Sequence, residues 1–186
     1  MNRFIIVGGG VIGMLTALEL VRAWQAVTLF ERADTGRESS WAGGGIVSPL
    51  FPWRYLDSVT RLASWSQAAY PDFCSQLFQD TGIDPQYTEC GLILVAPDEV
   101  MQAQQWARQH RRVLQAIDRA EFGRLEPRAA DPADQAIWMP QVGQVRNPRM
   151  VRALRRRLQQ LGVEVRTGVT IEGLLCRGGQ CDGVRS

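Results

Sequence analysis

The pattern G-x-G-x-x-G at residues 8–13 most constrains what this chain can fold into. It follows an apolar run at 4–7, typical of a buried parallel strand, and opens an almost wholly apolar stretch at 11–22 whose length favours a helix. A second apolar run at 27–30 ends on Glu31. A strand, a glycine turn, a helix and a second strand in this order predict a βαβ unit.

Each glycine of this turn has a physical reason. Gly8 permits the tight turn out of the strand, Gly10 lets the backbone approach a pyrophosphate, and Gly13 lets the helix pack closely on the sheet. The N–H groups and partial positive charge at the helix N-terminus favour phosphates. Glu31 can accept hydrogen bonds from ribose hydroxyls. The segment therefore predicts a dinucleotide site, and a glycine turn without a ligand is the alternative.

A second glycine-rich segment, E-S-S-W-A-G-G-G-I, occupies residues 38–46. Three successive glycines cost conformational entropy in an ordered element, so we expect them to contact a ligand. A backbone without side chains can lie flat against a planar group, while Ser39 and Ser40 offer hydroxyls. A NAD-dependent dehydrogenase has no need of this segment, so FAD is favoured over NAD. The alternative is a flexible surface loop.

The rest of the chain mixes helical and strand patterns, and Trp24 stands where a glycine is expected after the first helix. Pro71 predicts a kink or a new helix within the second helical stretch. The expected elements are a helix at 56–80 stopped by Gly82, a strand at 91–96, a surface helix at 98–114, no long element at 122–140, a helix at 148–161 with Asn147 as N-cap, strands at 163–166 and 169–175, and a hairpin turn at 177–180.

Composition excludes several chemistries. All 21 basic residues are arginine, so neither a pyridoxal phosphate Schiff base nor a Walker A loop can be built here. The single histidine, His110, argues against a catalytic triad or a multi-histidine metal site. The net charge of +2 argues against nucleic acid or an anionic membrane as partners. We expect no metal.

No apolar run approaches the ~18–20 residues of a membrane span, and the N-terminus does not resemble a secretory signal. A cytoplasmic location is therefore expected. The four cysteines, Cys74, Cys90, Cys176 and Cys181, form no C-x-x-C pair and indicate neither zinc nor a thioredoxin-like motif. We expect them to be reduced, and small buried or half-buried side chains.

Five blocks carry a resemblance to a known family: I-I-V-G-G-G-V-I-G-M-L-T-A-L-E-L at 5–20, V-T-L-F-E-R at 27–32, S-S-W-A-G-G-G-I-V-S-P at 39–49, Y-T-E-C-G-L-I-L-V-A at 87–96 and N-P-R-M-V-R-A-L at 147–154. The chain resembles the amino-terminal half of the glycine oxidase and D-amino acid oxidase family of flavoenzymes. It is most similar to the glycine oxidases of thiamine biosynthesis.

The resemblance implies FAD as the cofactor, Ile46 as a residue that lines the substrate pocket, and backbone contact between Val169 and the adenine. The expected cofactor-binding residues are Gly8, Gly10, Val11, Ile12, Gly13, Glu31, Arg32, Ser39, Ser40, Ala42, Gly43, Gly44, Gly45 and Val169. The family holds the substrate carboxylate with a later arginine. The catalytic and substrate-anchoring residues are therefore expected beyond Ser186 and are not assigned.

The expected fold is α/β, a dinucleotide-type parallel sheet with helices, interrupted by part of a smaller α+β substrate domain. The expected segments are 1–82 and 147–186 for the FAD-binding domain and 83–146 for the substrate domain. The chain reads as an amino-terminal half, so we expect the isolated 186 residues to be inactive. Its expected partners are a small amine or amino acid, a second copy of the chain, or the missing carboxy-terminal half.

For the complete enzyme the resemblance implies oxidation of a small amine or amino acid to the imine, glycine being favoured. Hydride passes to the flavin, and oxygen accepts the electrons to give peroxide. Two alternatives stay open: a NAD-dependent dehydrogenase, and a non-catalytic fragment or subunit that binds FAD. The sequence leaves open whether the substrate is glycine, sarcosine, proline or a D-amino acid.

Overall fold

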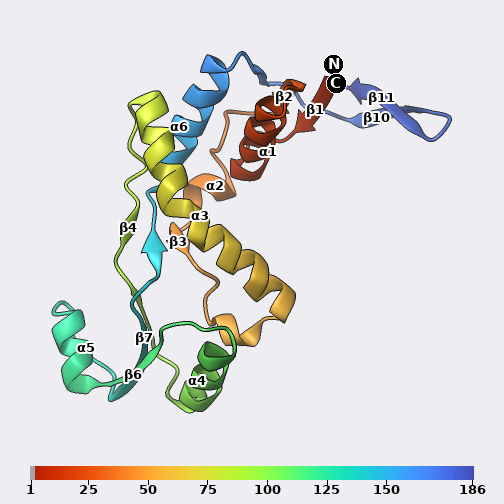
Figure 1. Ribbon diagram of the computed structural model, residues 1–186. Helices are drawn as coiled ribbons and strands as arrows, with labels where there is room; N and C mark the ends of the chain where they lie inside the picture. The colour runs from red at the N-terminus through yellow and green to blue at the C-terminus, as the bar shows by residue number, and fades with distance from the viewer. Residues whose placement is uncertain (1–2) are drawn as a thin grey trace. The chain divides into compact units, whose positions relative to one another are not determined.

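The computed structural model describes residues 3–186 (Figure 1). The chain divides into two compact units by internal contacts. The first unit contains residues 3–45, 72–86 and 146–186, and the second contains residues 46–71 and 87–145. The predicted boundary after residue 82 differs from this division, because residues 46–71 pack within the second unit. The sequence shows no break at residue 45, and only strand pairing further along the chain reveals it.

The first unit is built on the predicted βαβ segment. Strand β1 (Arg3–Val7), helix α1 (Val11–Arg22) and strand β2 (Ala26–Glu31) follow one another along the chain. β2 pairs in parallel with β1 on one side and with β9 (Glu164–Thr167) on the other, so the order is β1-β2-β9. The predicted α/β class with a parallel sheet is confirmed.

Gly13 sets how closely α1 can approach β1. A Cβ atom at this position would lie 2.0 Å from the backbone oxygen of Gly8, a distance that no side chain tolerates. Gly8 itself has a φ of 110°, in the region that favours glycine. The turn between β1 and α1 therefore requires glycine at both positions.

Trp24 takes the left-handed conformation, with φ of 60°, at the end of α1. Its N–H donates to the carbonyl of Val21 at 2.9 Å, and the N–H of Gln25 donates to the carbonyl of Leu20 at 3.0 Å. These two bonds form a Schellman motif. Trp24 thus fills the position where a glycine was expected, and its side chain is 81% exposed.

The first unit also contains helix α6 and the second part of helix α3. Helix α6 (Asn147–Gln160) packs on α1, and its buried side chains include Leu154 and Leu158. It begins at Asn147, so the prediction of Asn147 as the N-cap is wrong by one residue; its side chain instead donates to the Gly43 carbonyl. Helix α3 (Asp57–Thr81) runs without interruption through Pro71, so the predicted new helix there is wrong.

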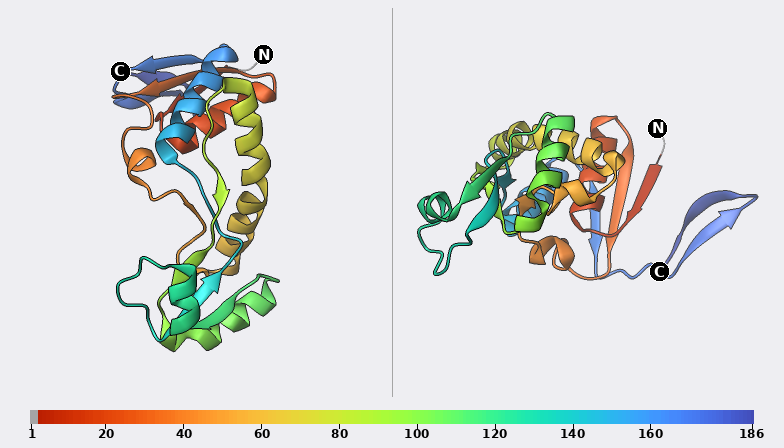
Figure 2. Two further views of the ribbon diagram at one scale, coloured as in Figure 1. Left: turned by 90° about the vertical axis from the view of Figure 1, so that its left-hand side faces the viewer. Right: turned by 90° about the horizontal axis from the view of Figure 1, so that it is seen from below.

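A short helix and a hairpin are the remaining described elements of the first unit. Helix α2 (Ser39–Ala42) lies within the glycine-rich segment. Strands β10 (Gly173–Arg177) and β11 (Gln180–Arg185) pair antiparallel across the predicted turn (Figure 2). The strand expected at 169–175 therefore begins later, because Val169 instead follows the end of β9 and contacts β2.

The second unit contains two antiparallel sheets, with orders β3-β8-β4 and β5-β7-β6. Its strands are β3 (Ile46–Val47), β4 (Thr88–Glu89), β5 (Leu92–Leu94), β6 (Gln115–Asp118), β7 (Gln135–Met139) and β8 (Gly143–Gln144). Its helices, besides the first part of α3, are η1 (Pro52–Arg54), η2 (Pro97–Glu99), α4 (Val100–Gln109) and α5 (Arg119–Leu125).

The segment 122–140, expected to hold no long element, contains the end of α5 and the five-residue strand β7. Ile137 of β7 is fully buried. The core of the second unit gathers around β7: Trp53, Leu94, Ala96, Ala103, Trp106, Ala107, Ile137, Met139 and Val142. Within residues 3–186, no helix is long and apolar enough to cross a membrane.

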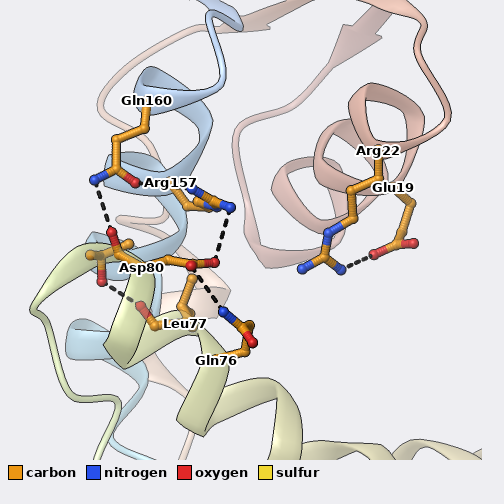
Figure 3. Close-up of polar contacts among 8 residues, drawn as sticks. Glu19, Arg22, Gln76, Leu77, Asp80, Arg157 and Gln160 are labelled. Carbon is orange, nitrogen blue, oxygen red and sulfur yellow. Dashed lines mark hydrogen bonds and ion pairs between the residues drawn. The ribbon is translucent and has the colours of Figure 1, made fainter.

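A polar cluster around Asp80 ties the end of α3 to α6 (Figure 3). The carboxylate lies 3.1 Å from the guanidinium of Arg157 and accepts a hydrogen bond from Gln76 at 2.9 Å. The side chain of Gln160 donates to the backbone carbonyl of Asp80 at 3.0 Å. The Asp80 side chain is only 18% exposed, so this ion pair is shielded from solvent more than a surface pair.

Replacing Asp80 with alanine leaves the Arg157 guanidinium half-buried without its carboxylate. We expect Asp80→Ala to lower the free energy of unfolding by about 1–3 kcal/mol, measured by urea denaturation. The matched control is the exposed pair Glu19–Arg22 on α1, also drawn in Figure 3. Glu19→Ala should cost less than about 0.5 kcal/mol. Equal losses in the two variants would contradict a structural role for Asp80.

Candidate functional site

The predicted site residues of the first unit gather at one edge of its parallel sheet. Residues 8–13 follow β1, Glu31 ends β2, and Val169 follows β9. Because the carboxyl ends of parallel strands meet at the same edge, segments far apart in the sequence come together here. The Val169 N–H donates to the backbone carbonyl of Glu31 at 3.0 Å, which confirms that β2 and the segment after β9 are in contact.

Glu31 organises the backbone around the glycine turn. One carboxylate oxygen accepts from the N–H of Gly9 at 2.7 Å, and the other accepts from the N–H of Ala33 at 2.9 Å. The sequence analysis gave this residue only a ligand role, so its structural role was missed. An ionised carboxylate has about four acceptor positions, so Glu31 can still accept from a ribose hydroxyl.

Ser40 reaches the N-terminus of α1. Its hydroxyl oxygen accepts a hydrogen bond from the N–H of Val11 at 2.9 Å. Gly10, the N-cap residue, has no side chain that could do this. A Cβ at Gly10 would lie 3.2 Å from the same hydroxyl. Ile12, in the first turn of α1, is 74% exposed.

The three glycines at 43–45 differ in the reason why each position holds glycine. A Cβ at Gly43 would lie 2.7 Å from the Asn147 amide nitrogen, which donates to the Gly43 carbonyl at 2.9 Å. Gly45 has a φ of 75°, which favours glycine. Gly44 has neither constraint, because nothing lies within 4 Å of its Cβ position. The protein itself therefore explains Gly43 and Gly45, whereas Gly44 leaves open space.

Arg32, predicted as a cofactor-binding residue, pairs with Glu38 across the segment between β2 and α2. Its Nε donates to the Glu38 carboxylate at 3.1 Å. The hydrogen bond to Glu38, followed by the attraction of that charge, raises the pKa of Arg32 above its usual value. Both side chains are exposed. The pair brings Ser39, the first residue of α2, close to the end of β2.

Thr35 is a candidate site residue that the sequence analysis missed. Its side chain is buried, and its hydroxyl has no hydrogen-bond partner among the described residues. Its methyl carbon lies 2.9 Å from the Cβ position of Gly9, and the next residue, Gly36, donates its N–H to the Gly9 carbonyl at 2.9 Å. An unsatisfied buried hydroxyl costs about 1–3 kcal/mol, so a water or ligand atom at this site would lower the free energy.

Ile46, predicted to line the substrate pocket, belongs to the second unit. It is 42% exposed and lies on the wall of a hollow of about 200 Å³ in that unit. Ser48, Gln67 and Tyr70 also line this hollow. The Gln67 amide donates to the backbone carbonyl of Val47 at 2.9 Å, which holds α3 beside β3. Ile46 thus presents an apolar side chain to a space that has polar groups on its other walls.

In the part of the chain that the structure describes, no group of three or more histidine, cysteine or acidic side chains could hold a metal ion. His110 pairs with Asp57 at 3.4 Å and stacks near Trp106, in the second unit. Around the turn after β1, the fold brings the side chains of Glu31 and Ser40 to backbone N–H donors.

Two named proteins are similar to this chain in sequence. A protein named glycine oxidase from Pseudomonas aeruginosa is 45% identical over 184 residues, which are 98% of this chain and 50% of that protein. A bifunctional protein ThiO/ThiG from Trichormus variabilis is 30% identical over 98% of this chain and 28% of its own length. The chain thus spans about half the length of the glycine oxidase that it matches, or less of the longer relative.

The fold is shared with solved structures. The crystal structure of glycine oxidase from Bacillus cereus superposes with a TM-score of 0.88 over 98% of this chain and 50% of that one, at 22% identity. At this identity the likeness shows the fold alone. The model of the DAO family, described as FAD dependent oxidoreductase, matches residues 3–186. Because this match covers all the described residues, the chain belongs to the DAO family of FAD dependent oxidoreductases.

Proposed function

We propose that the first unit holds FAD at the turn between β1 and α1. The pyrophosphate would lie against Gly10 and the first-turn N–H groups of α1, and Glu31 would accept from the ribose hydroxyls. The adenine would lie beside the backbone of Val169. Ser39, Ser40 and residues 42–45 would contact the flavin half. The open space at Gly44, which nothing in the protein explains, is the observation that carries this proposal.

The residues present fit this cofactor in two further respects. Glu31 and Ser40 already hold the backbone N–H groups of Gly9 and Val11, so the turn is in place before a ligand arrives. Such preorganisation reduces the entropy that binding would otherwise cost. The buried hydroxyl of Thr35 lacks a partner beside the same turn and could be satisfied through a bound water.

The proposed reaction of the whole protein is oxidation of a small amine or amino acid to the imine, with oxygen as acceptor and peroxide as product. Bound FAD supplies the two-electron oxidation chemistry. Glycine is favoured as the substrate because the Pseudomonas aeruginosa relative carries the name glycine oxidase. The ThiO/ThiG relative supports a place in thiamine biosynthesis. Within this chain, Ile46 would limit the size of the substrate side chain in the hollow of the second unit.

A binding subunit without catalytic activity is the second candidate. The residue that anchors the substrate carboxylate is not assigned in residues 3–186. The two candidates differ in one measurable property, since both bind FAD and only one turns over.

The full-length gene product, loaded with FAD, should produce peroxide from glycine faster than from sarcosine, proline or D-alanine. A coupled peroxidase assay measures each rate, and anaerobic mixing shows whether glycine bleaches the flavin absorbance. If glycine bleaches the flavin anaerobically but the coupled assay in air detects no peroxide, oxygen is refuted as the acceptor. A stable flavin spectrum with all four substrates would support the non-catalytic reading, and the absence of flavin after reconstitution would refute both.

We expect Glu31→Ala to weaken FAD binding at least about tenfold, because a hydrogen bond to a charged group contributes about 1.5–3 kcal/mol. Glu31→Gln keeps one acceptor oxygen and should lose less. Fluorescence titration with FAD measures the dissociation constant of each variant. The control is Glu19→Ala, an exposed acid on α1 that pairs with Arg22 and lies outside the predicted cofactor set, which should change the affinity less than about twofold. Equal affinities for wild type and Glu31→Ala would assign Glu31 a structural role only.

We expect Gly44→Val to fold with wild-type stability, within about 0.5 kcal/mol, and to lose FAD affinity, because the space beside Gly44 is free of protein atoms. Gly13→Ala is the contrasting variant. Its Cβ would collide with the Gly8 carbonyl, so it should lose about 1–3 kcal/mol of stability without any ligand. Urea denaturation and FAD titration of both variants test this. Normal FAD binding by Gly44→Val would contradict the cofactor position.

A further inference from the structure

The hairpin at the end of the first unit places two cysteines directly opposite one another. In the register of β10 and β11, Cys176 is paired with Cys181, and Arg177 is paired with Gln180. The two residues between them, Gly178 and Gly179, have φ values of 57° and 81°. Positive φ at both central positions is the signature of a type I′ turn, the tight connection that fixes hairpin register. The turn therefore sets the pairing of the two cysteines, and the register shifts only on their far side, between Leu175 and Cys176.

The position of this pair in the hairpin suits a disulfide. Residues that flank a two-residue turn exchange both backbone hydrogen bonds, so the next pair along the ladder is of the non-hydrogen-bonded kind. Opposite residues of that kind have Cα atoms about 4.5 Å apart and side chains on the same face. A disulfide requires Cα atoms about 4.4–6.8 Å apart, so a regular pair of the kind that Cys176 and Cys181 form in the register suits one.

The two thiols are accessible and interact with one another. Both cysteines are exposed and neither is in a disulfide. The pKa of the Cys176 thiol is raised, first by its partial removal from water and then by the charge of Cys181 and a hydrogen bond with it. The Cys181 thiol also donates to the Gly183 carbonyl at 3.5 Å. Exposure of these thiols differs from the buried or half-buried positions expected from the sequence.

We propose that Cys176 and Cys181 form a reversible cross-strand disulfide by exchange with a low-molecular-weight disulfide. The thiolate of one cysteine attacks a sulfur of the small disulfide, forming a mixed disulfide and releasing one small thiolate. The second cysteine, after losing its proton, then attacks the protein sulfur of the mixed disulfide and releases the second small thiolate. Two protein thiols are oxidised, one small disulfide is reduced to two thiols, and the two protons pass to those thiols.

The other two cysteines lack this arrangement. Cys74 is buried, and its burial raises its pKa to about 11, so little of it is the reactive thiolate. Cys90 is exposed, but its neighbours are the Gly91 carbonyl and the Gln144 side chain of the second unit. Cys90 should therefore stop at the mixed disulfide. In the hairpin, a second thiol lies opposite the first and can attack a mixed disulfide formed on it.

The chain offers a direct test, because trypsin cleaves after Arg177, between the two cysteines. Incubation with oxidised glutathione, blocking of the remaining thiols and digestion should give peptides 167–177 and 178–185 linked together, which separate only after reduction. Cys90→Ser should leave the linked pair unchanged. Cys181→Ser should instead carry glutathione on Cys176 and yield no linked pair, a complete loss.

The comparison of folded with urea-unfolded protein shows whether the hairpin, rather than proximity in sequence, drives the reaction. In a series of glutathione redox buffers, the equilibrium constant for closing the disulfide should be at least tenfold larger in the folded protein. Equal constants in the two states would overturn the proposal. Glutathione on both cysteines without a linked pair in the folded protein would overturn it as well.

Discussion

The close approach of α1 to β1 is the constraint on which the first unit depends. The Cβ position of Gly13 lies 2.0 Å from the Gly8 carbonyl oxygen, so the helix can begin immediately after the turn only without a side chain there. This approach places the N-terminus of α1 at the carboxyl end of the sheet. It also leaves Met14, Ala17 and Leu18 fully buried, which fixes the direction of the helix. One steric requirement thereby sets both the packing and the position of the helix N-terminus.

The polar side chains around this turn are hydrogen-bonded to the protein's own backbone. Glu31 holds Gly9 and Ala33 through its two carboxylate oxygens, and its backbone carbonyl accepts from Val169. Ser40 satisfies Val11 from a segment 29 residues further along the chain. Contacts of this kind limit the conformations that the turn can adopt. The chain belongs to the DAO family of FAD dependent oxidoreductases, and our proposal gives this turn the role of holding the cofactor.

Local backbone conformation in this chain does not always follow the preferences of the residue. Trp24 adopts the left-handed region that usually holds glycine, and Pro71 lies inside a continuous helix. Both carry a conformational cost, which the Schellman bonds donated by Trp24 and Gln25 offset in one case and the flanking turns of α3 in the other. The hairpin of β10 and β11 is the opposite case, since its glycines take the conformation that they prefer and bring Cys176 opposite Cys181.

By itself the sequence determined the βαβ unit, the cofactor class and the family, because glycine spacing and apolar runs are local patterns with a direct steric meaning. It also located α1 to the residue. The tertiary structure alone decided that residues 46–71 join the second unit, that Asn147 bonds to Gly43, and that Thr35 is buried without a partner. Each of these depends on contacts between segments far apart in the chain. A sequence pattern records the preference of a segment, whereas only packing decides which distant segment satisfies it.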